Sequence, residues 1–172
     1  FIDYQLGDTT TNVVAFDYHE YYDSWYGYVI KLFYCNSNGR AFVSADTGRT
    51  WTQLAIPNDD IVNDCDGIYF GSYHGNVYRY DTYTSTVSLS LTGVLTDRVK
   101  VGYKANAYYT GDNEGYAVDY TGKTAAKEVG NPWQVGDAVQ YGGEDFITSY
   151  GRNFITGFAG SIFSAIDGYY PG

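Results

Sequence analysis

The sequence predicts an all-β fold of short strands joined by glycine-containing turns. Aromatic residues make up 19% of its 172 residues, with 21 Tyr and 21 Gly, while Leu is sparse. Aromatic side chains fit a pleated, half-buried surface, and glycine suits the turns between strands. No window carries a sustained helical period, and the best helical candidate, residues 124–129, is only about one and a half turns long. The composition therefore favours a sheet protein.

An internal repeat supports this prediction. Four glycines that we assign to hairpin turns are each followed, two and three positions later, by a small or aliphatic residue and then a larger apolar one: Gly39, Gly75, Gly115 and Gly160. Their spacings are 36, 40 and 45 residues, and an apolar strand segment precedes each. This period fits a four-stranded unit of about 40 to 45 residues. A lone unit cannot bury its own faces, so we expect residues 1–172 to form one domain of stacked units.

The segment from Ser44 to Trp51 reads S-x-D-x-G-x-T-W. Asp46 is expected to accept hydrogen bonds from backbone N–H groups two or three residues on, and Gly48 to take a positive φ. Trp51 is expected to fold its ring against the sheet. The pattern resembles the Asp-box of BNR-like β-propellers, and this resemblance implies that the box is structural and lies away from any active site.

A second resemblance lies in residues 66–81. They are similar to the blade core of quinoprotein-like propellers, in which D-G-x-x-Y-x-G-[ST] leads into a G-x-V-Y turn and strand. Residues 106–122 match more loosely, and the likeness to propeller blades extends over residues 12–168. It implies a β-propeller-type fold of about four blades, or part of a larger or shared ring, and identifies no single family.

The closure of such a ring is open to three interpretations. Residues 1–6 alternate apolar and polar side chains, so they could supply a latch strand that completes the last blade and hides two sheet edges. Alternatively, several chains could share blades, or the chain could be part of a larger ring. A β-sandwich or β-prism is the third alternative.

The charge of the chain limits its partners. A net charge of −10 repels polyanions, so we expect neither nucleic acid nor an anionic membrane surface as a partner. No apolar run approaches the roughly 20 residues of a membrane span, so we expect no membrane insertion. The chain contains no Met. We therefore expect a processed product or a piece of a longer polypeptide.

Residues 58–67 concentrate oxygen ligands suited to calcium, with Asp60, Asp64 and Asp66 as candidates. A loop rich in turn-forming residues explains this segment equally well, and we expect no other cofactor. Cys35 and Cys65 lie about one repeat apart. They could form a bridge between neighbouring blades or remain two independent, half-buried thiols.

Enzymatic activity is not expected. A sialidase needs several arginines to clamp a carboxylate and a Tyr nucleophile, whereas this chain has five arginines and one Asp-box. Five acidic residues are candidates for the paired carboxylates of a glycosidase: Asp17, Glu20, Asp23, Glu144 and Asp145. Solvated turn residues are the simpler interpretation of most of them.

Exposed aromatic residues are the remaining functional candidates. Trp25 and Trp133 lie in segments that favour loops or strand edges. The candidate glycan or partner contacts are Trp25, Tyr26, Tyr73, His74 and Trp133. We expect a non-catalytic structural or assembly module, extracellular or in a virion, such as a tail, fibre or nozzle component. It would bind protein partners or itself. The alternatives are a glycan-binding lectin-type propeller and, third, a fragment of an Asp-box glycoside hydrolase.

Overall fold

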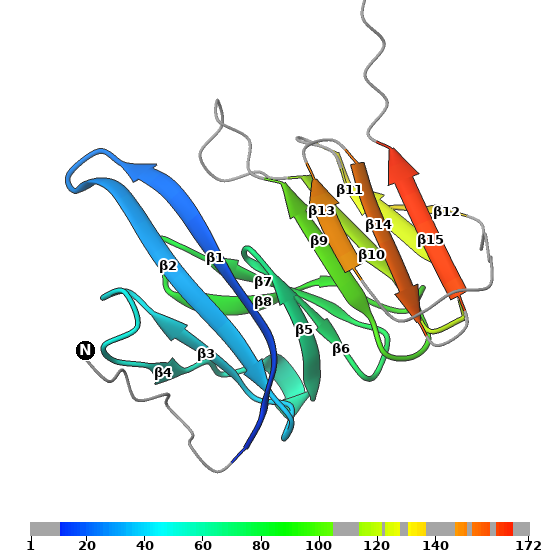
Figure 1. The fold of residues 1–172 in the computed structure, drawn as a ribbon, viewed down its shortest axis with the longest axis horizontal. Coiled ribbons are helices and arrows are strands. Elements are labelled where there is room, and N and C mark those ends of the chain that lie inside the picture. The colour runs from blue at the N-terminus through cyan, green and yellow to red at the C-terminus, as the bar shows by residue number, and fades with distance from the viewer. Residues whose placement is uncertain are drawn as a thin grey trace, which may run out of the picture.

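The computed structural model describes residues 11–104, 114–121, 123–127, 131–136, 147–150, 153–158 and 161–166. Within these residues the chain forms four antiparallel sheets and no α-helix, which confirms the all-β prediction (Figure 1). A 3-10 turn at Pro57–Asp59 joins the first two sheets. The latch strand expected at residues 1–6 lies outside the described residues.

Each sheet is a meander whose strands pair in chain order. Sheet A holds β1 (Val13–Asp23), β2 (Gly27–Asn36), β3 (Ala41–Ser44) and β4 (Thr52–Gln53). Sheet B holds β5 (Val62–Asp66), β6 (Tyr69–Ser72), β7 (Val77–Asp81) and β8 (Thr86–Leu91). Sheet C holds β9 (Lys100–Lys104), β10 (Glu114–Val118), β11 (Thr124–Lys127) and β12 (Gln134–Gly136). Sheet D holds β13 (Ile147–Tyr150), β14 (Asn153–Phe158) and β15 (Ser161–Ile166).

The first strands of the four sheets lie side by side. Contacts join β1 to β5, β5 to β9 and β9 to β13, so the sheets succeed one another like blades (Figure 1). Two carboxylates on these strands reach the next sheet. Asp17 Oδ2 accepts a hydrogen bond from the Gly67 backbone N–H at 2.5 Å, and Asp64 Oδ2 accepts one from that of Val101 at 2.8 Å.

The turn after the second strand is built in the same way in sheets A, B and C. A buried side chain closes it: Asn36, Ser72 or Asp119. The side-chain oxygen accepts hydrogen bonds from the backbone N–H groups two and four residues later, at 2.9 to 3.1 Å. The backbone N–H of the same residue donates to the carbonyl four residues later at 3.0 Å. Such side-chain caps satisfy buried backbone groups that the sheet ladder leaves unpaired.

The assignment of Gly115 to a turn is wrong. Gly115 lies within β10, and the equivalent turn of sheet C begins at Asp119, whose backbone N–H donates to the Lys123 carbonyl. A Cβ atom at Gly115 would lie 2.8 Å from Tyr69 Cε2 and 2.9 Å from Trp133 Cη2. Glycine is therefore required there because two rings pack against the strand, not because the chain turns. Gly160 lies outside the described residues, and residues 124–127 of the helical candidate form β11.

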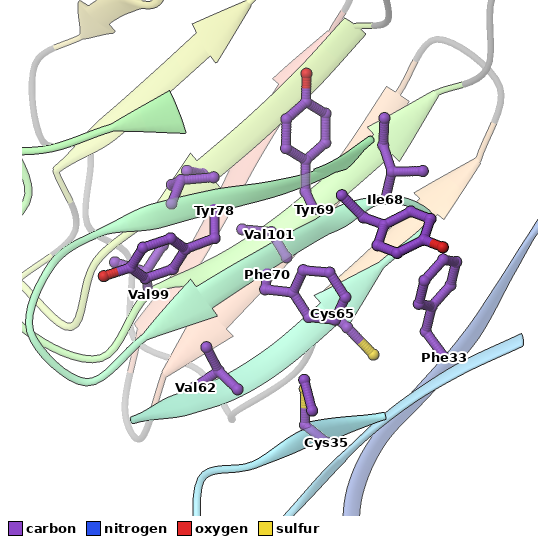
Figure 2. Packing of buried hydrophobic residues seen from close by; sticks show 14 of the residues in the cluster. Phe33, Cys35, Val62, Cys65, Ile68, Tyr69, Phe70, Tyr78, Val99 and Val101 are labelled. Atoms are coloured by element: carbon purple, nitrogen blue, oxygen red, sulfur yellow. The ribbon is translucent and has the colours of Figure 1, made fainter. Parts of the chain in front are cut away.

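The core between sheets A and B is largely aromatic. The Phe33 ring meets Phe70 edge to face with a centroid distance of 5.7 Å (Figure 2). It meets Tyr80 in the same way at 5.2 Å. Tyr69 and Tyr78 are also buried almost completely. Edge-to-face pairs are favoured by the ring quadrupoles, so these aromatic residues fill the space that leucine occupies in other cores.

The two cysteines meet in this core. Cys35 on β2 and Cys65 on β5 are both buried and both free, so they are neither a bridge nor half-buried (Figure 2). A hydrogen bond between the two thiols, together with burial, raises the pKa of Cys65 well above its usual value. Both side chains therefore act as small apolar groups at the junction of the two sheets.

The fold predicts that Gly75→Ala destabilises the protein much more than Gly27→Ala. Both glycines have a positive φ, of 78° and 76°. A Cβ atom at Gly75 would lie 2.2 Å from the Leu95 carbonyl oxygen, whereas one at Gly27 meets no atom within 4 Å. Urea denaturation should show a loss of about 1 kcal/mol for Gly27→Ala and of about 3 kcal/mol or more for Gly75→Ala. Equal losses would contradict the close approach at Gly75.

Candidate functional site

The turn from Ser44 to Trp51 connects β3 and β4 through a network centred on Asp46. Asp46 Oδ1 accepts hydrogen bonds from Ser44 Oγ and from the Thr50 backbone N–H, both at 2.8 Å, and Thr50 Oγ1 donates to Oδ2 at 2.7 Å. The backbone bond comes from four residues on, one further than expected. These bonds, led by that from the Thr50 backbone, lower the pKa of Asp46 to about 2. The expected positive φ of Gly48 is confirmed at 89°.

The Trp51 ring lies against the sheet, as expected. It meets the Tyr34 ring edge to face at 4.8 Å, and Tyr34 in turn stacks on Phe42 at 4.7 Å. The Trp51 indole N–H is buried and has no hydrogen-bond partner among the described residues. The turn and its tryptophan therefore form a structural plug on sheet A.

Most of the exposed aromatic side chains among the described residues lie on the hairpin of β1 and β2. Side chains alternate across a strand, and the register places Tyr18 beside Leu32, Glu20 beside Ile30 and Tyr22 beside Tyr28. We call one side of this hairpin the aromatic face, and its large exposed members are Phe16, Tyr18, Tyr22, Tyr28 and Ile30. The hairpin extends beyond the other strands of sheet A (Figure 1).

The tip of this hairpin holds two of the predicted contact residues. Trp25 is 90% exposed and Tyr26 is 84% exposed. Asp23 Oδ1 accepts hydrogen bonds from the backbone N–H groups of both residues, at 2.8 and 3.0 Å, and so fixes the turn that presents them. The sequence prediction and the structure agree on the exposure of these two rings.

Tyr73 and His74 lie on the turn between β6 and β7, where Tyr73 is exposed. The His74 side chain is 65% exposed, and its Nδ1 lies 2.5 Å from Oδ1 of Asp60, whose side chain is only 5% exposed. Asn76 and Tyr78 donate hydrogen bonds to Asp60 Oδ2 at 2.9 and 2.8 Å. Burial pushes the pKa of Asp60 upward, but the hydrogen bonds outweigh it and hold the pKa at about 2. Asp60 thus orients His74 and ties the preceding loop to sheet B.

The three calcium candidates are not brought together. Asp60 is engaged as described, Asp64 is buried and bonds to Val101, and Asp66 ends β5. Among the residues that the structure describes, no three side chains of His, Cys, Asp or Glu are grouped so that they could hold a metal ion. Burial raises the pKa of Asp64 to about 6.

Trp133 differs from its expected exposure. Its ring packs edge to face on Tyr69 at 5.6 Å and against the strand at Gly115, and its indole N–H donates to Ser90 Oγ at 2.9 Å. The tryptophan is half-buried between sheets B and C because the absent side chain of Gly115 leaves room for it. It is therefore a packing residue.

Two of the carboxylates considered for glycoside hydrolysis accept hydrogen bonds from backbone N–H groups. Asp17 bonds to Gly67, and Asp23 caps the hairpin tip. Glu20 is exposed on the aromatic face, while Glu144 and Asp145 lie outside the described residues. Both described aspartates are explained by local structure.

A cleft of mixed polar and apolar lining, which no sequence pattern predicted, lies between sheets A and B. Its volume is about 680 Å³, and its walls come from β2–β4 on one side and β7–β8 on the other. Lys31 lines it and is only 8% exposed, and its Nζ lies 2.9 Å from Tyr80 Oη. The signal available in the sequence was a single lysine in the otherwise apolar run of residues 28–35.

The succession of meander sheets, with first strands in contact and a tryptophan plug on sheet A, defines a β-propeller-type protein. Solved structures show the same fold. YCF48 from Cyanidioschyzon merolae matches with a TM-score of 0.54 and 12% identity over 89% of this chain and 50% of that chain. YCF48 bound to D1 peptide matches with a TM-score of 0.52 and 13% identity over 90% and 50%.

The chain thus spans about half the length of these solved structures. No family model and no curated protein sequence matches it. In the described part of the chain there is no helix with the length and apolar character needed to cross a bilayer.

We predict that Asp64→Asn stabilises the protein at neutral pH. The folded-state pKa of about 6 lies above the ordinary 3.8, so ionisation of Asp64 opposes folding. The stability that its neutral form contributes is complete below about pH 4 and is lost as the pH rises through 6. Urea denaturation should show a gain in the free energy of unfolding at pH 7.5 that is lost at pH 3.5.

Asp46→Asn serves as the control of opposite sign. The pKa of Asp46 is lowered, so its ionised form stabilises the turn, and the substitution should destabilise the protein at pH 7.5. A loss of stability for Asp64→Asn at pH 7.5 would show that the buried carboxylate is favourable, contrary to this account.

Proposed function

We propose that this chain is a non-catalytic assembly module that binds another protein, outside a cell or in a virion. The observation that carries the proposal is the aromatic face of the β1–β2 hairpin. Five large aromatic or aliphatic side chains are exposed on this face, and large exposed apolar patches on soluble proteins mark interaction sites. Tyrosine and tryptophan also dominate the energetics of protein interfaces, because each buries a large rigid ring and keeps a polar end.

The hairpin is preorganised for binding. Its strands pair without interruption from Ala15 to Asp23, and Tyr22 and Tyr28 already pack edge to face at 5.5 Å. Rings fixed on paired strands lose little conformational entropy when a partner covers them. The aromatic face can therefore act as an interface without rearrangement.

The structural comparison is consistent with a protein partner. One of the matching propellers is a YCF48 bound to a D1 peptide, so a propeller of similar shape binds a polypeptide. The charge of −10 favours a partner with a basic or neutral surface.

We also propose that the turn from Ser44 to Trp51 makes this chain a relative of the Asp-box propellers. The support is the network around Asp46, in which each specified residue of the S-x-D-x-G-x-T-W pattern has a physical task. Ser44 and Thr50 bond to the carboxylate, Gly48 supplies the positive φ and Trp51 covers Tyr34.

A second candidate function, glycan binding, is favoured by the exposure of Trp25 and Tyr26 at the hairpin tip. Flat rings held in solvent can stack on the C–H faces of sugars. Trp25→Ala is expected to abolish selective binding of the purified chain on a glycan array, with Tyr83→Ala as the matched exposed control. A blank array for the unaltered chain would remove this candidate and leave the assembly role.

The assembly role predicts site-specific cross-linking through the aromatic face. A photo-reactive phenylalanine placed at Tyr28, in the chain expressed in its native setting, should give a discrete protein adduct identifiable by mass spectrometry. Placed at Tyr83, which is 71% exposed on the turn after β7, it should give at least tenfold less of that adduct. The adduct at position 28 should also fall when Tyr22 is changed to Ser.

Two results would speak against the proposal. Equal adducts at positions 28 and 83 would mean that the aromatic face is no more engaged than the rest of the surface. An adduct that is a saccharide rather than a protein would favour the glycan-binding alternative.

A further inference from the structure

The buried side chain of Lys31 places a positive charge in the lining of the cleft between sheets A and B. Lys31 lies on the side of the hairpin opposite the aromatic face, where the register pairs it with His19. Its ammonium group donates a hydrogen bond to the Tyr80 hydroxyl at 2.9 Å. Within 4.0 Å of this ammonium there is no carboxylate oxygen among the described residues. A buried charge without a counter-charge is costly, so an anion in the cleft would be favoured.

The neighbouring histidine does not compete for such an anion. His19 is buried beside Lys31, and burial above all lowers its pKa to about 4. The ring is therefore neutral at physiological pH. Lys31 is the one cation that lines the described cleft, so a single anionic group of the ligand would point at it.

The walls of the cleft suit a polyhydroxylated ligand. Thr50, Thr52 and Thr86 contribute hydroxyl groups to the lining, and Gln53 contributes an amide. Val43 and Val87 add apolar surface on the two sides. Sugars combine hydroxyl groups with apolar C–H faces, and the volume of about 680 Å³ lies in the range of small-ligand pockets.

The negative charge of Asp46 would orient an anionic, hydroxylated ligand in the cleft. The Asp46 carboxylate lines the cleft but is already bound by Ser44 and Thr50, and its lowered pKa keeps it ionised. A ligand carboxylate is therefore repelled from Asp46 and attracted to Lys31. Free oxygen lone pairs of Asp46 can accept hydrogen bonds from ligand hydroxyl groups.

From these contacts we propose that the cleft binds an acidic saccharide, a sugar whose carboxylate pairs with Lys31 while its hydroxyl groups bond to the threonine-lined walls. The chemistry is shared by a free uronic acid and by a uronic acid residue of a polysaccharide. This site is separate from the aromatic face, so its failure would leave the cross-linking test of the assembly role unaffected.

The test is titration of the purified full chain by two-dimensional NMR and calorimetry. The probes are glucuronate, an oligosaccharide of glucuronic acid, and glucose as the neutral control. We expect saturable binding of glucuronate with shifts confined to sheets A and B, and at least tenfold weaker binding of glucose. Tighter binding of the oligosaccharide than of glucuronate would identify a polymer as the source, and equal binding a free sugar acid.

Variants separate the charge from the fold. Lys31→Met keeps the length of the side chain and removes the charge, and it should weaken glucuronate binding at least tenfold. Lys123→Met, on the turn of sheet C, is the matched control and should bind as the unaltered chain does. Thr52→Val removes one exposed hydroxyl and should weaken binding several-fold. A melting curve shows that each variant is folded.

The proposal is overturned by any of three results. These are the absence of saturable glucuronate binding, equal binding of glucose and glucuronate, and unchanged glucuronate binding by a folded Lys31→Met variant.

Discussion

The buried side-chain oxygens of Asn36, Ser72 and Asp119 hold the turns on which the joining of the sheets depends. Each oxygen accepts two backbone N–H groups and fixes the chain as it leaves the second strand. Carbonyl groups of these turns also bond to the segment that follows. The Gly39 carbonyl accepts a hydrogen bond from the Val62 backbone N–H, and the Ser72 carbonyl accepts one from that of Val99. A turn without its side-chain cap would no longer hold these carbonyl groups in place. The backbone N–H groups that bond to them would then lose their partners.

The use of tyrosine as a core residue gives the molecule polar groups in its interior. A tyrosine ring fills space as leucine would, but its hydroxyl needs a partner. Tyr80 finds Lys31 at the edge of the cleft, and Tyr78 finds Asp60 beside the 3-10 turn. The spaces between sheets therefore carry charged and hydroxyl groups, and this is why a binding cleft can arise there. The exterior differs from the interior. The tyrosine hydroxyl groups on the aromatic face of the β1–β2 hairpin have no hydrogen-bond partner among the described residues.

The architecture was predictable from the sequence because turn chemistry repeats along it. The all-β class and the task of Asp46 follow from local spacing, and each needs only a few neighbouring residues. Gly115 was misplaced because glycine has two uses, at turns and at close approaches, and only the packing of Tyr69 and Trp133 distinguishes them. The same packing buried Trp133. Lys31 and the bond between Asp60 and His74 escaped because they depend on residues from different strands or loops, which spacing alone does not reveal.

The carboxylates of Asp17 and Asp64 have a consequence for how the protein can be divided. Each belongs to one sheet and is satisfied by a backbone N–H of the next, from Gly67 and from Val101. A cut between sheets A and B or between sheets B and C would remove one of these bonds and would also expose the apolar side chains packed at the same junction. Neither junction can therefore be opened without loss of stability. The unit that recurs in the sequence is smaller than the unit that can exist alone.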